Sequence, residues 1–319
     1  MAVFVMMVGV AGSGKSTEAK KIIRNWAEDG FAKSAIVSSD AIRAELYGDA
    51  SIQGDPNKVF RLMRERMMAL LADDYNVIYD ATNLAAKKRA AVVHMIRDAY
   101  KDKVRCLCRI VTATEEVCVE RQEKRDRKVP ADVIHRQICQ FEMPFYNEGW
   151  DGISIRTTNR RFLIQDYLVD HWNMNQKNSH HTLSLGEHCL AAANGVRRLV
   201  IGDDIYRADN LGEESDWIAT VLDDAAMYHD VGKVATQKFR EGDSNAHYYN
   251  HNNYSAWLMA CDCEGHAYLD GWIMSIALVQ WHMQYFMVDD MNAWLAKKGF
   301  STLFCFLLDI LHRADVDAH

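Results

Sequence analysis

A glycine-rich segment near the N-terminus has the residue types and spacing that bind phosphate. Gly9-Val10-Ala11-Gly12-Ser13-Gly14-Lys15-Ser16 fits the pattern G-x-x-x-x-G-K-[ST], after an apolar strand-like run and at the start of a helical stretch. Glycines let backbone N–H groups surround phosphate oxygens, and the helix N-terminus adds a positive dipole end. Lys15 is expected to reach the β- and γ-phosphates and Ser16 to ligate Mg²⁺. The expected phosphate-binding residues are Gly9, Gly12, Ser13, Gly14, Lys15, Ser16 and Thr17.

Two carboxylates follow the next predicted strands. Asp40 and Arg43 lie in SSDAIR after the second strand, and Asp80 begins DATN after the third. Ligands of a parallel sheet bind at the carboxyl ends of its strands. Asp40 could therefore take a proton from an attacking hydroxyl, and Arg43, on the same helical face, could hold an acceptor phosphate. The alternative is an N-capping aspartate with a surface arginine. Asp80 is expected to bind a Mg²⁺-coordinated water or to hydrogen-bond to residues that themselves contact the ligand.

A basic segment, Glu120–Pro130, precedes the next predicted helix. Its cations could close over a nucleotide and stabilise charge on a transferred phosphoryl group. The alternative is a solvated charged helix.

The ordered set of these motifs resembles the 5′-hydroxyl polynucleotide kinases of bacteriophages and bacterial end-repair systems, over residues 1–150. The resemblance implies ATP and Mg²⁺ as cofactors. It also implies that Asp40 is the general base and Arg43 the acceptor-phosphate clamp, while Asp80 and Asn83 form the acceptor pocket. The donor phosphates would be contacted by the lid arginine Arg125, and Arg121 or Arg127 could exchange roles with it.

The second half contains a set of metal-ligating residue types. His229-Asp230-Val231-Gly232-Lys233 ends a predicted helix, with His188 upstream and His251, His282 and Asp315 downstream. Imidazole with carboxylate suits Mn, Fe, Co, Ni or Zn better than a pure Mg site. A single buried histidine is usually a structural residue, but a set of six ligands on successive helices indicates a metal centre.

This set resembles the HD-domain phosphohydrolase superfamily, over residues 176–319. The resemblance implies a first metal held by His188, His229, Asp230 and Asp315. It implies a second held by His251 and His282, with Asp230 bridging the two ions. Lys233 would contact the scissile phosphate during in-line hydrolysis. His180 and His181 could line the pocket or lie on the surface of the junction.

The elements needed to position these residues differ between the halves. The first half alternates strand-like and helix-like runs, which predicts a parallel sheet with flanking helices. The second half has long amphipathic helical patterns and no convincing strand, which predicts an all-α domain. The predicted fold is thus an α/β P-loop kinase domain (1–160), a junction (161–175) and an all-α HD domain (176–319).

The predicted strands are Val3–Val8, Ala35–Val37, Val77–Tyr79, Val104–Val111 and Ile153–Ile155. The predicted helices are Lys15–Trp26, Asn57–Leu71, Ala85–Ala99, Glu115–Arg121, Pro130–Glu142, Leu185–Leu199, Asp216–Tyr228, Tyr254–Cys261, Leu269–Gln280 and Thr302–His312.

Composition excludes several classes of protein. The 319 residues are 49% hydrophobic and 25% charged, which excludes a disordered or collagen-like chain. The eight cysteines lack disulfide-scaffold spacing and fit reduced thiols. The opening apolar run lacks a basic lead and is too short to span a bilayer, so we expect a soluble cytoplasmic protein with no membrane contact. A phage-encoded protein acting in the host cytoplasm stays open.

The resemblances together favour an enzyme that heals nucleic-acid ends, with RNA or DNA ends as its substrate. A 5′-kinase would act beside a phosphoesterase for 2′,3′-cyclic phosphate or 3′-phosphate ends. No K-x-D-G ligase signature is present, so a separate ligase would seal the ends. The alternative is a nucleoside or sugar kinase fused to an HD nucleotidase, because the first 170 residues carry a balance of only +3. A regulatory module that binds nucleotide without turnover fits less well with six intact ligands. A homo-oligomer stays open.

Overall fold

The computed structural model describes residues 1–31, 33–125, 128–159, 161–177, 182–202, 212–262 and 269–318. Its contacts divide the chain into two compact units. The first is Met1–Gln137 with Pro144–Arg160, and the second is Ile138–Met143 with Arg161–His319. In the described ranges, no helix combines the length and apolar character needed to cross a membrane.

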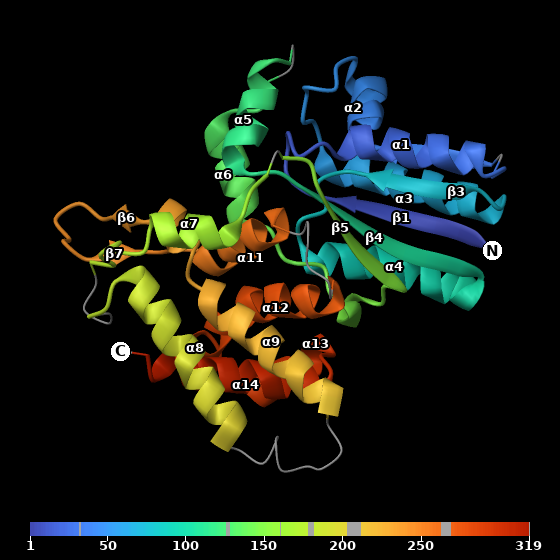
Figure 1. Cartoon of the computed structure of the whole chain (residues 1–319). Helices are drawn as coiled ribbons and strands as arrows, with labels where there is room; N and C mark the ends of the chain where they lie inside the picture. The colour runs from blue at the N-terminus through green and yellow to red at the C-terminus, as the bar shows by residue number, and fades with distance from the viewer. Residues whose placement is uncertain are drawn as a thin grey trace. The chain divides into compact units, whose positions relative to one another are not determined.

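A five-stranded parallel sheet forms the centre of the first unit, in the order β2-β3-β1-β4-β5 (Figure 1). The strand bounds are β1 (Ala2–Val8), β2 (Ser34–Ser38), β3 (Asn76–Asp80), β4 (Val104–Thr112) and β5 (Gly152–Thr157). Because all strands run the same way, the carboxyl ends of β1, β2 and β3 lie at one edge of the sheet. The glycine-rich loop, Asp40 and Asp80 are all at or just beyond these ends.

Helices cover both faces of the sheet, and its central strands are therefore buried on both sides. Val5 and Met7 of β1 pack with Ala19 of α1, and the alternate residues Phe4 and Met6 are also buried. The helices of the first unit are α1 (Lys15–Glu28), α2 (Ser39–Tyr47), α3 (Pro56–Ala72), α4 (Ala86–Tyr100), α5 (Glu115–Glu123) and α6 (Ala131–Cys139), with short turns η1 (Lys101–Lys103) and η2 (Tyr146–Glu148). The predicted parallel sheet with flanking helices is confirmed.

Two predictions for this half need correction. Helix α2 was not among the predicted helices, although Asp40 and Arg43 were expected on one helical face. The helix predicted over Pro130–Glu142 ends at Cys139. After this end, Phe141 packs edge-on against Trp257 with ring centroids 5.1 Å apart.

The second unit is a group of packed helices. Helix α8 packs against α9 and α14, and α12 packs against α9 and α11 (Figure 1). Almost every residue of α11 and α12 is buried, so these are core helices without a polar face. The helices are α7 (Ile164–Asp170), α8 (Leu185–Gly202), α9 (Gly212–Tyr228), α10 (Lys233–Thr236), α11 (His251–Cys261), α12 (Leu269–Trp281), α13 (Met291–Lys298) and α14 (Thr302–Val316), with the turn η3 (His282–Phe286).

The expectation of no strand in this half is wrong. Strands β6 (Lys238–Phe239) and β7 (Ala246–His247) form a small antiparallel hairpin. Two residues per strand are too few to show the alternation of apolar and polar residues by which a strand is predicted. The stretch predicted as a junction, 161–175, also contains helix α7.

A segment from the predicted first domain packs with the second unit. Asn253 Nδ2 donates to the Cys139 carbonyl at 2.7 Å, and the Met143 N–H donates to Gln280 Oε1 at 3.1 Å. Through these bonds and the Phe141 ring, Ile138–Met143 packs within the second unit. The predicted boundary at residue 160 had placed this segment in the first.

Candidate active sites

The glycine-rich loop has the backbone shape that phosphate binding needs. Gly12 has φ +85°, and a Cβ atom there would lie 2.5 Å from the Cys118 carbonyl oxygen. Gly9 and Gly14 also have positive φ. Lys15 Nζ donates to the Val10 carbonyl at 2.7 Å. The buried hydroxyl of Ser13 has no hydrogen-bond partner among the described residues. An orphaned donor inside such a loop fits an anion ligand.

Lys15 is buried, and this changes its acid–base behaviour. Burial lowers the pKa of Lys15 to about 8, although the charges of Asp80 and Asp40 act to raise it. Arg125 acts with burial to lower it, so its charge reaches the loop. Thr17 is exposed in the first turn of α1, where its N–H donates to the Gly14 carbonyl at 3.1 Å.

The structure brings Ser16 and Asp80 together. Ser16 Oγ donates to Asp80 Oδ2 at 2.8 Å, at the carboxyl end of β3. Burial raises the pKa of Asp80, against the opposing effects of the Ser16 hydrogen bond and the Lys15 charge. A hydroxyl beside a carboxylate is a ligand set that suits Mg²⁺. The two residues therefore fit the metal that a phosphate-binding loop of this type uses.

Asp40 and Arg43 form an ion pair at the same edge. Arg43 Nη1 lies 3.1 Å from Asp40 Oδ1, and the side chains of Arg43 and Asp40 are 11% and 58% exposed. The charge of Asp40 affects the pKa values of both Lys15 and Asp80, so it lies beside the phosphate loop. The arginine therefore orients an accessible carboxylate.

The loop after Asp80 is held by contacts that sequence reasoning missed. Asn83 Nδ2 donates to the Met7 carbonyl at 2.8 Å, so this amide group ties the predicted acceptor loop to β1. The buried Arg89 donates from Nη1 to the carbonyls of Asn83 and Leu84 at 2.9 and 2.7 Å. It also pairs with the buried Glu148 at 2.6 Å. No motif marked Arg89 or Glu148, which are far apart in sequence.

The basic segment contacts the loop mainly through Arg121. Arg121 Nη1 donates to the Gly12 carbonyl at 3.1 Å and to Thr158 Oγ1 at 2.7 Å, while Nη2 donates to the Thr158 carbonyl at 2.6 Å. Thr158 Oγ1 in turn donates to the Ser13 carbonyl at 2.7 Å. Arg121 therefore holds the loop in shape, while Arg125 contributes its charge. Arg127 lies outside the described residues, as do His180 and His181.

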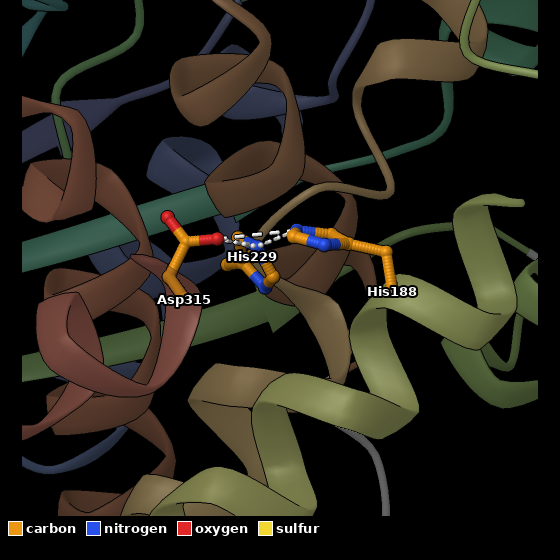
Figure 2. Close-up of side chains that lie close together, drawn as sticks. All are labelled: His188, His229 and Asp315. Atoms are coloured by element: carbon orange, nitrogen blue, oxygen red, sulfur yellow. Dashed lines mark hydrogen bonds and ion pairs between the residues drawn. The ribbon is translucent and has the colours of Figure 1, made fainter. Parts of the chain in front are cut away.

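Three predicted metal ligands of the second unit converge from different segments (Figure 2). His188 lies on α8, His229 follows α9, and Asp315 lies on α14. The two Nε2 atoms are 3.1 Å apart. Asp315 Oδ1 lies 3.1 Å from His188 Nε2 and 3.2 Å from His229 Nε2. All three residues are buried.

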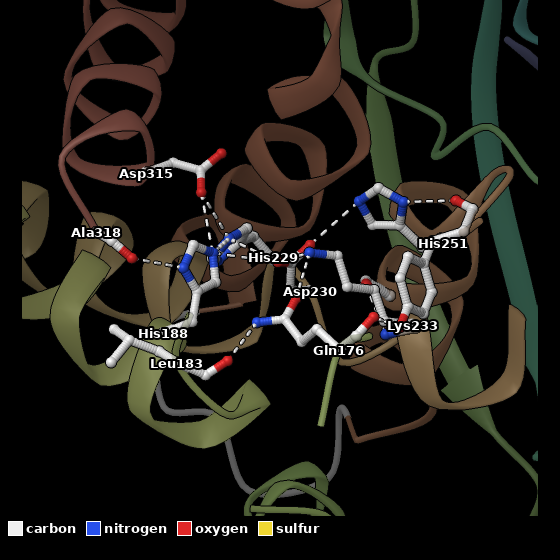
Figure 3. Close-up of polar contacts among 12 residues, drawn as sticks. Gln176, Leu183, His188, His229, Asp230, Lys233, His251, Asp315 and Ala318 are labelled. Atoms are coloured by element: carbon white, nitrogen blue, oxygen red, sulfur yellow. Dashed lines mark hydrogen bonds and ion pairs between the residues drawn. The ribbon is translucent and has the colours of Figure 1, made fainter. Parts of the chain in front are cut away.

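Asp230 lies between this group and a second one (Figure 3). Its Oδ2 is 3.2 Å from His188 Nε2 and 3.4 Å from His229 Nε2. Its Oδ1 is 3.1 Å from His251 Nε2 and 3.9 Å from His282 Nε2. The Nε2 atoms of His251 and His282 are 3.3 Å apart. One carboxylate thus presents a different oxygen to each pair of histidines.

The histidines are oriented in the way that metal ligands require. Each Nδ1 lies 2.7–2.9 Å from a backbone carbonyl, which places a hydrogen on Nδ1, so that the neutral imidazole carries its lone pair on Nε2. The carbonyls belong to Ala318, Ala226, Tyr248 and Val279. Donor atoms about 2.1 Å from one ion are about 3.0–3.4 Å apart in octahedral or tetrahedral arrangements. The first group has distances within this range, and the second does too except for the 3.9 Å from Asp230 Oδ1 to His282 Nε2. The donor set is thus a candidate site for two divalent transition-metal ions that share Asp230.

The electrostatics of this site favours a positive charge among the ligands. The carboxylates of Asp230 and Asp315 outweigh burial and raise the pKa of His188 and, more strongly, that of His229, and a bound metal ion would supply that positive charge instead. Burial, with the neighbouring imidazoles, lowers the pKa of His282 to about 3, so this histidine is neutral. Burial opposes ionisation of Asp230, but Lys233 and His229 outweigh it and hold the pKa of that carboxyl well below its usual range. Asp230 is therefore an anion, as a bridging ligand must be.

Lys233 is held at the edge of the candidate metal centre by several groups (Figure 3). Its Nζ lies 2.6 Å from Asp230 Oδ2 and donates to Gln176 Oε1 at 2.7 Å. The Tyr248 ring centroid lies 5.5 Å from the same nitrogen. Lys233 was predicted from the motif that begins at His229, whereas Gln176 and Tyr248 belong to no recognisable motif and were not predicted.

Gly232 gives the ligands room to meet. A Cβ atom at this position would lie 2.2 Å from the His251 carbonyl oxygen, and the Gly232 N–H donates to Ser255 Oγ at 2.8 Å. Only a residue without a side chain lets the start of α11 approach so closely.

Comparisons with known proteins agree with the first of these sites. A family model described as "AAA domain" (AAA_33) matches residues 4–144, which include most of β1, the glycine-rich loop and β2 to β4. The first unit is a P-loop kinase-like domain. Such a domain uses ATP and Mg²⁺.

Two solved structures have limited similarity. A chain of the Pnkp1/Rnl/Hen1 complex is 25% identical over 38% of this chain and 38% of that one, with a TM-score of 0.31. A gluconokinase from Sinorhizobium meliloti 1021 is 18% identical over 49% of this chain and 83% of that one, with a TM-score of 0.33. With TM-scores this low, neither likeness supports a function. This chain thus covers well under half of the first of these chains, and no curated protein matches it.

Proposed function

We propose that this chain heals broken nucleic-acid ends with two activities. The first unit would be an ATP-dependent polynucleotide 5′-hydroxyl kinase. The second would be an HD-type, metal-dependent phosphoesterase for 2′,3′-cyclic phosphate or 3′-phosphate ends. The observation that carries the proposal is that one chain contains both a phosphoryl-transfer loop and two histidine pairs that share Asp230.

The kinase step follows from the positions of Asp40, Arg43 and the phosphate loop. Asp40 would accept the proton of the 5′-hydroxyl as its oxygen forms a bond to the γ-phosphorus and the bond from that phosphorus to ADP breaks. Arg43 would hold the adjoining phosphate of the acceptor. Lys15, Arg125 and the loop N–H groups would stabilise charge on the transferred group. Mg²⁺, held by Ser16 and Asp80, would supply charge neutralisation on the donor phosphates.

The hydrolytic step follows from the convergence of ligands around Asp230. Divalent ions bound there would supply Lewis-acid activation of the phosphate ester and a more acidic water. Lys233 would bind a phosphate oxygen, since its nitrogen lies at the edge of the ligand set. Gln176 would keep that nitrogen in place. One water is consumed for each ester bond that breaks.

The two activities complement each other. Their combined products, a 3′-hydroxyl and a 5′-phosphate, are the ends that a nucleic-acid ligase joins. A separate ligase would therefore act next. We also propose that the protein acts in the cytoplasm, where ATP and RNA or DNA ends are available. It would act there as a single chain or as a homo-oligomer.

The kinase is tested by transfer of label from γ-labelled ATP. We expect label on a 5′-hydroxyl oligonucleotide, and Asp40→Asn should reduce transfer at least 100-fold while ATP still binds. Label that appears only on free nucleosides or sugars would contradict the nucleic-acid assignment and favour a small-molecule kinase. Asp132→Asn, a change in an exposed surface ion pair, serves as the matched control.

The phosphoesterase is tested with an oligonucleotide ending in a 2′,3′-cyclic phosphate. The double variant His229→Ala/Asp230→Ala should lose hydrolysis and keep the kinase. Hydrolysis that persists in this variant would show that another site is responsible. The retained kinase activity reports that the first unit is folded.

A further inference from the structure

A basic and aromatic surface lies beside the metal centre. We call Lys177, Lys238, Phe239, Arg240 and Tyr249 the hairpin surface, since all five lie on or next to β6 and β7. Phe239 and Tyr249 are 49% and 54% exposed, and all three cations are exposed. Large exposed aromatic side chains next to cations are typical of sites that bind single-stranded nucleic acid.

Positive charge is concentrated here against the trend of the second half. After residue 170 the chain has 10 Lys and Arg against 20 Asp and Glu. Four of those ten cations are Lys233 and the three cations of the hairpin surface. Two acidic residues lie in the turn and offset part of this charge. Asp243 stays ionised because the Asn245 N–H at 2.8 Å and His247 at 3.1 Å lower its pKa, and these bonds hold its carboxylate within the turn. Glu241 is the other carboxylate of the turn.

The rings keep surface available for a ligand. Lys177 Nζ lies 5.7 Å from the centroid of the Phe239 ring, and Arg240 Cζ lies 5.8 Å from that of Tyr249. His247 stacks on Tyr249 at 5.7 Å with the rings only 5° from parallel. These contacts hold each ring in place, while about half of its surface remains exposed.

The hairpin surface is joined directly to the metal ligands. Tyr248, next to Tyr249, accepts from His251 Nδ1 through its carbonyl at 2.8 Å, and its ring lies under Lys233. The Ala246 N–H donates to the Lys177 carbonyl at 2.7 Å. The hairpin surface is thus connected through Tyr248 and Lys177 to the segments that hold His251 and Lys233.

We propose that the hairpin surface binds the single-stranded 3′ segment of a nucleic acid and directs its terminal phosphate to the metal centre. Bases would stack on Phe239 and Tyr249, and the cations would contact the backbone phosphates. This inference rests on the phosphoesterase function proposed above. It makes the second unit selective for oligonucleotide ends over mononucleotides.

Binding is tested first by photo-crosslinking, because this readout does not need catalysis. A 5′-phosphorylated oligonucleotide with 4-thiouridine next to a 3′-phosphate is irradiated with the full chain, and the linked peptide is sequenced. We expect crosslinks in residues 237–250. Crosslinks confined to other parts of the chain would overturn the proposal, whether or not hydrolysis is seen.

Catalysis gives the second test, through the double variant Phe239→Ala/Tyr249→Ala. We expect kcat/KM for a 3′-phosphorylated ten-nucleotide oligomer to fall at least tenfold, with less than a twofold change for a 3′-mononucleotide. The matched control is Phe306→Ala, which removes a ring that is 42% exposed on α14. Equal losses for both substrates, or no loss for either, would overturn the proposal.

Two further outcomes separate this inference from the proposed function. If the wild-type chain hydrolyses neither substrate, the phosphoesterase proposal fails, and the crosslink alone decides the hairpin surface. If the double variant changes only the molar mass measured by light scattering, the surface is a contact between copies of this chain and the inference is wrong.

Discussion

Gly232 leaves the space in which the residues of the candidate metal centre come together. Its missing side chain lets the His251 carbonyl and the Ser255 N–H lie 2.2 and 2.6 Å from where a Cβ atom would be. Both neighbours are backbone atoms, so they cannot rotate away as a side chain could. The approach of α11 to Asp230, and with it the position of His251, depends on this residue.

Gly232→Ala should therefore displace His251 and weaken the second metal position. We expect the variant to be less stable by about 1–3 kcal/mol. We expect bound metal, measured by mass spectrometry, to fall from two ions to one per chain, with kinase activity unchanged. Ser255→Ala, which removes the acceptor of the Gly232 N–H without adding an atom there, is the comparison. Equal metal loss in the two variants would show that the hydrogen bond matters and the space does not.

Asp224 gives a pH dependence whose sign can be worked out. Burial, with the charges of Asp223 and Asp262, raises the pKa of Asp224 to about 6 from a usual value of 3.8. The folded chain thus holds this proton more tightly than the unfolded chain does. The resulting stability is fully present below pH 3.8 and is lost as the pH rises through about 6.

Asp224→Asn should remove this loss. The variant should be more stable than the wild type at pH 8 by about 1–3 kcal/mol, and the difference should shrink at pH 5. Calorimetric melting temperatures of the second unit at both pH values measure the effect. A difference that is the same at pH 5 and pH 8 would contradict the raised pKa.

At the scale of elements, α5 stabilises the phosphate loop from outside it. Arg121 at the end of this helix connects the Gly12 carbonyl with Thr158, which follows β5. Its guanidinium makes these bonds through two nitrogens in a fixed plane, which an ammonium group cannot reproduce. The loop shape thus depends on a helix and a strand distant from it in sequence.

Arg121→Lys should weaken ATP binding while leaving the chemical step largely intact. Loss of bonds from a charged donor amounts to about 1.5–3 kcal/mol, so the KM for ATP should rise about tenfold or more. Steady-state kinetics at saturating acceptor separates the change in KM for ATP from any change in kcat. A large fall in kcat with unchanged KM would instead assign Arg121 to the transferred phosphoryl group.

Sequence patterns predicted some elements well and others not at all. The strands of the parallel sheet and the helix after the phosphate loop were predictable, because apolar periodicity and glycine spacing are local signals. The proximity of Ser16 to Asp80 followed from strand topology. The hairpin was missed because its strands have two residues each. The docking of Ile138–Met143 was missed because it depends on Asn253 and Gln280, more than a hundred residues later.

At the scale of the whole molecule, the two sites differ in metal chemistry. Oxygen ligands from Ser16 and Asp80 suit Mg²⁺, whereas four imidazoles around Asp230 suit transition metals. After metal removal by a chelator, Mg²⁺ alone should restore the kinase but not hydrolysis, and Mn²⁺ should restore both. Full hydrolysis with Mg²⁺ alone would contradict the assignment of the histidine groups.

The central claim is that one chain repairs both sides of a break. The most direct measurement supplies the full chain with ATP, Mg²⁺ and Mn²⁺, together with a cut RNA that has a 2′,3′-cyclic phosphate and a 5′-hydroxyl. Mass spectrometry of the RNA pieces then identifies their ends. The account predicts that one piece ends in a 3′-hydroxyl beside its 2′-hydroxyl, and that the other piece begins with a 5′-phosphate. The account would be contradicted if either original end were recovered unchanged while the same protein transferred phosphate from ATP to a small molecule.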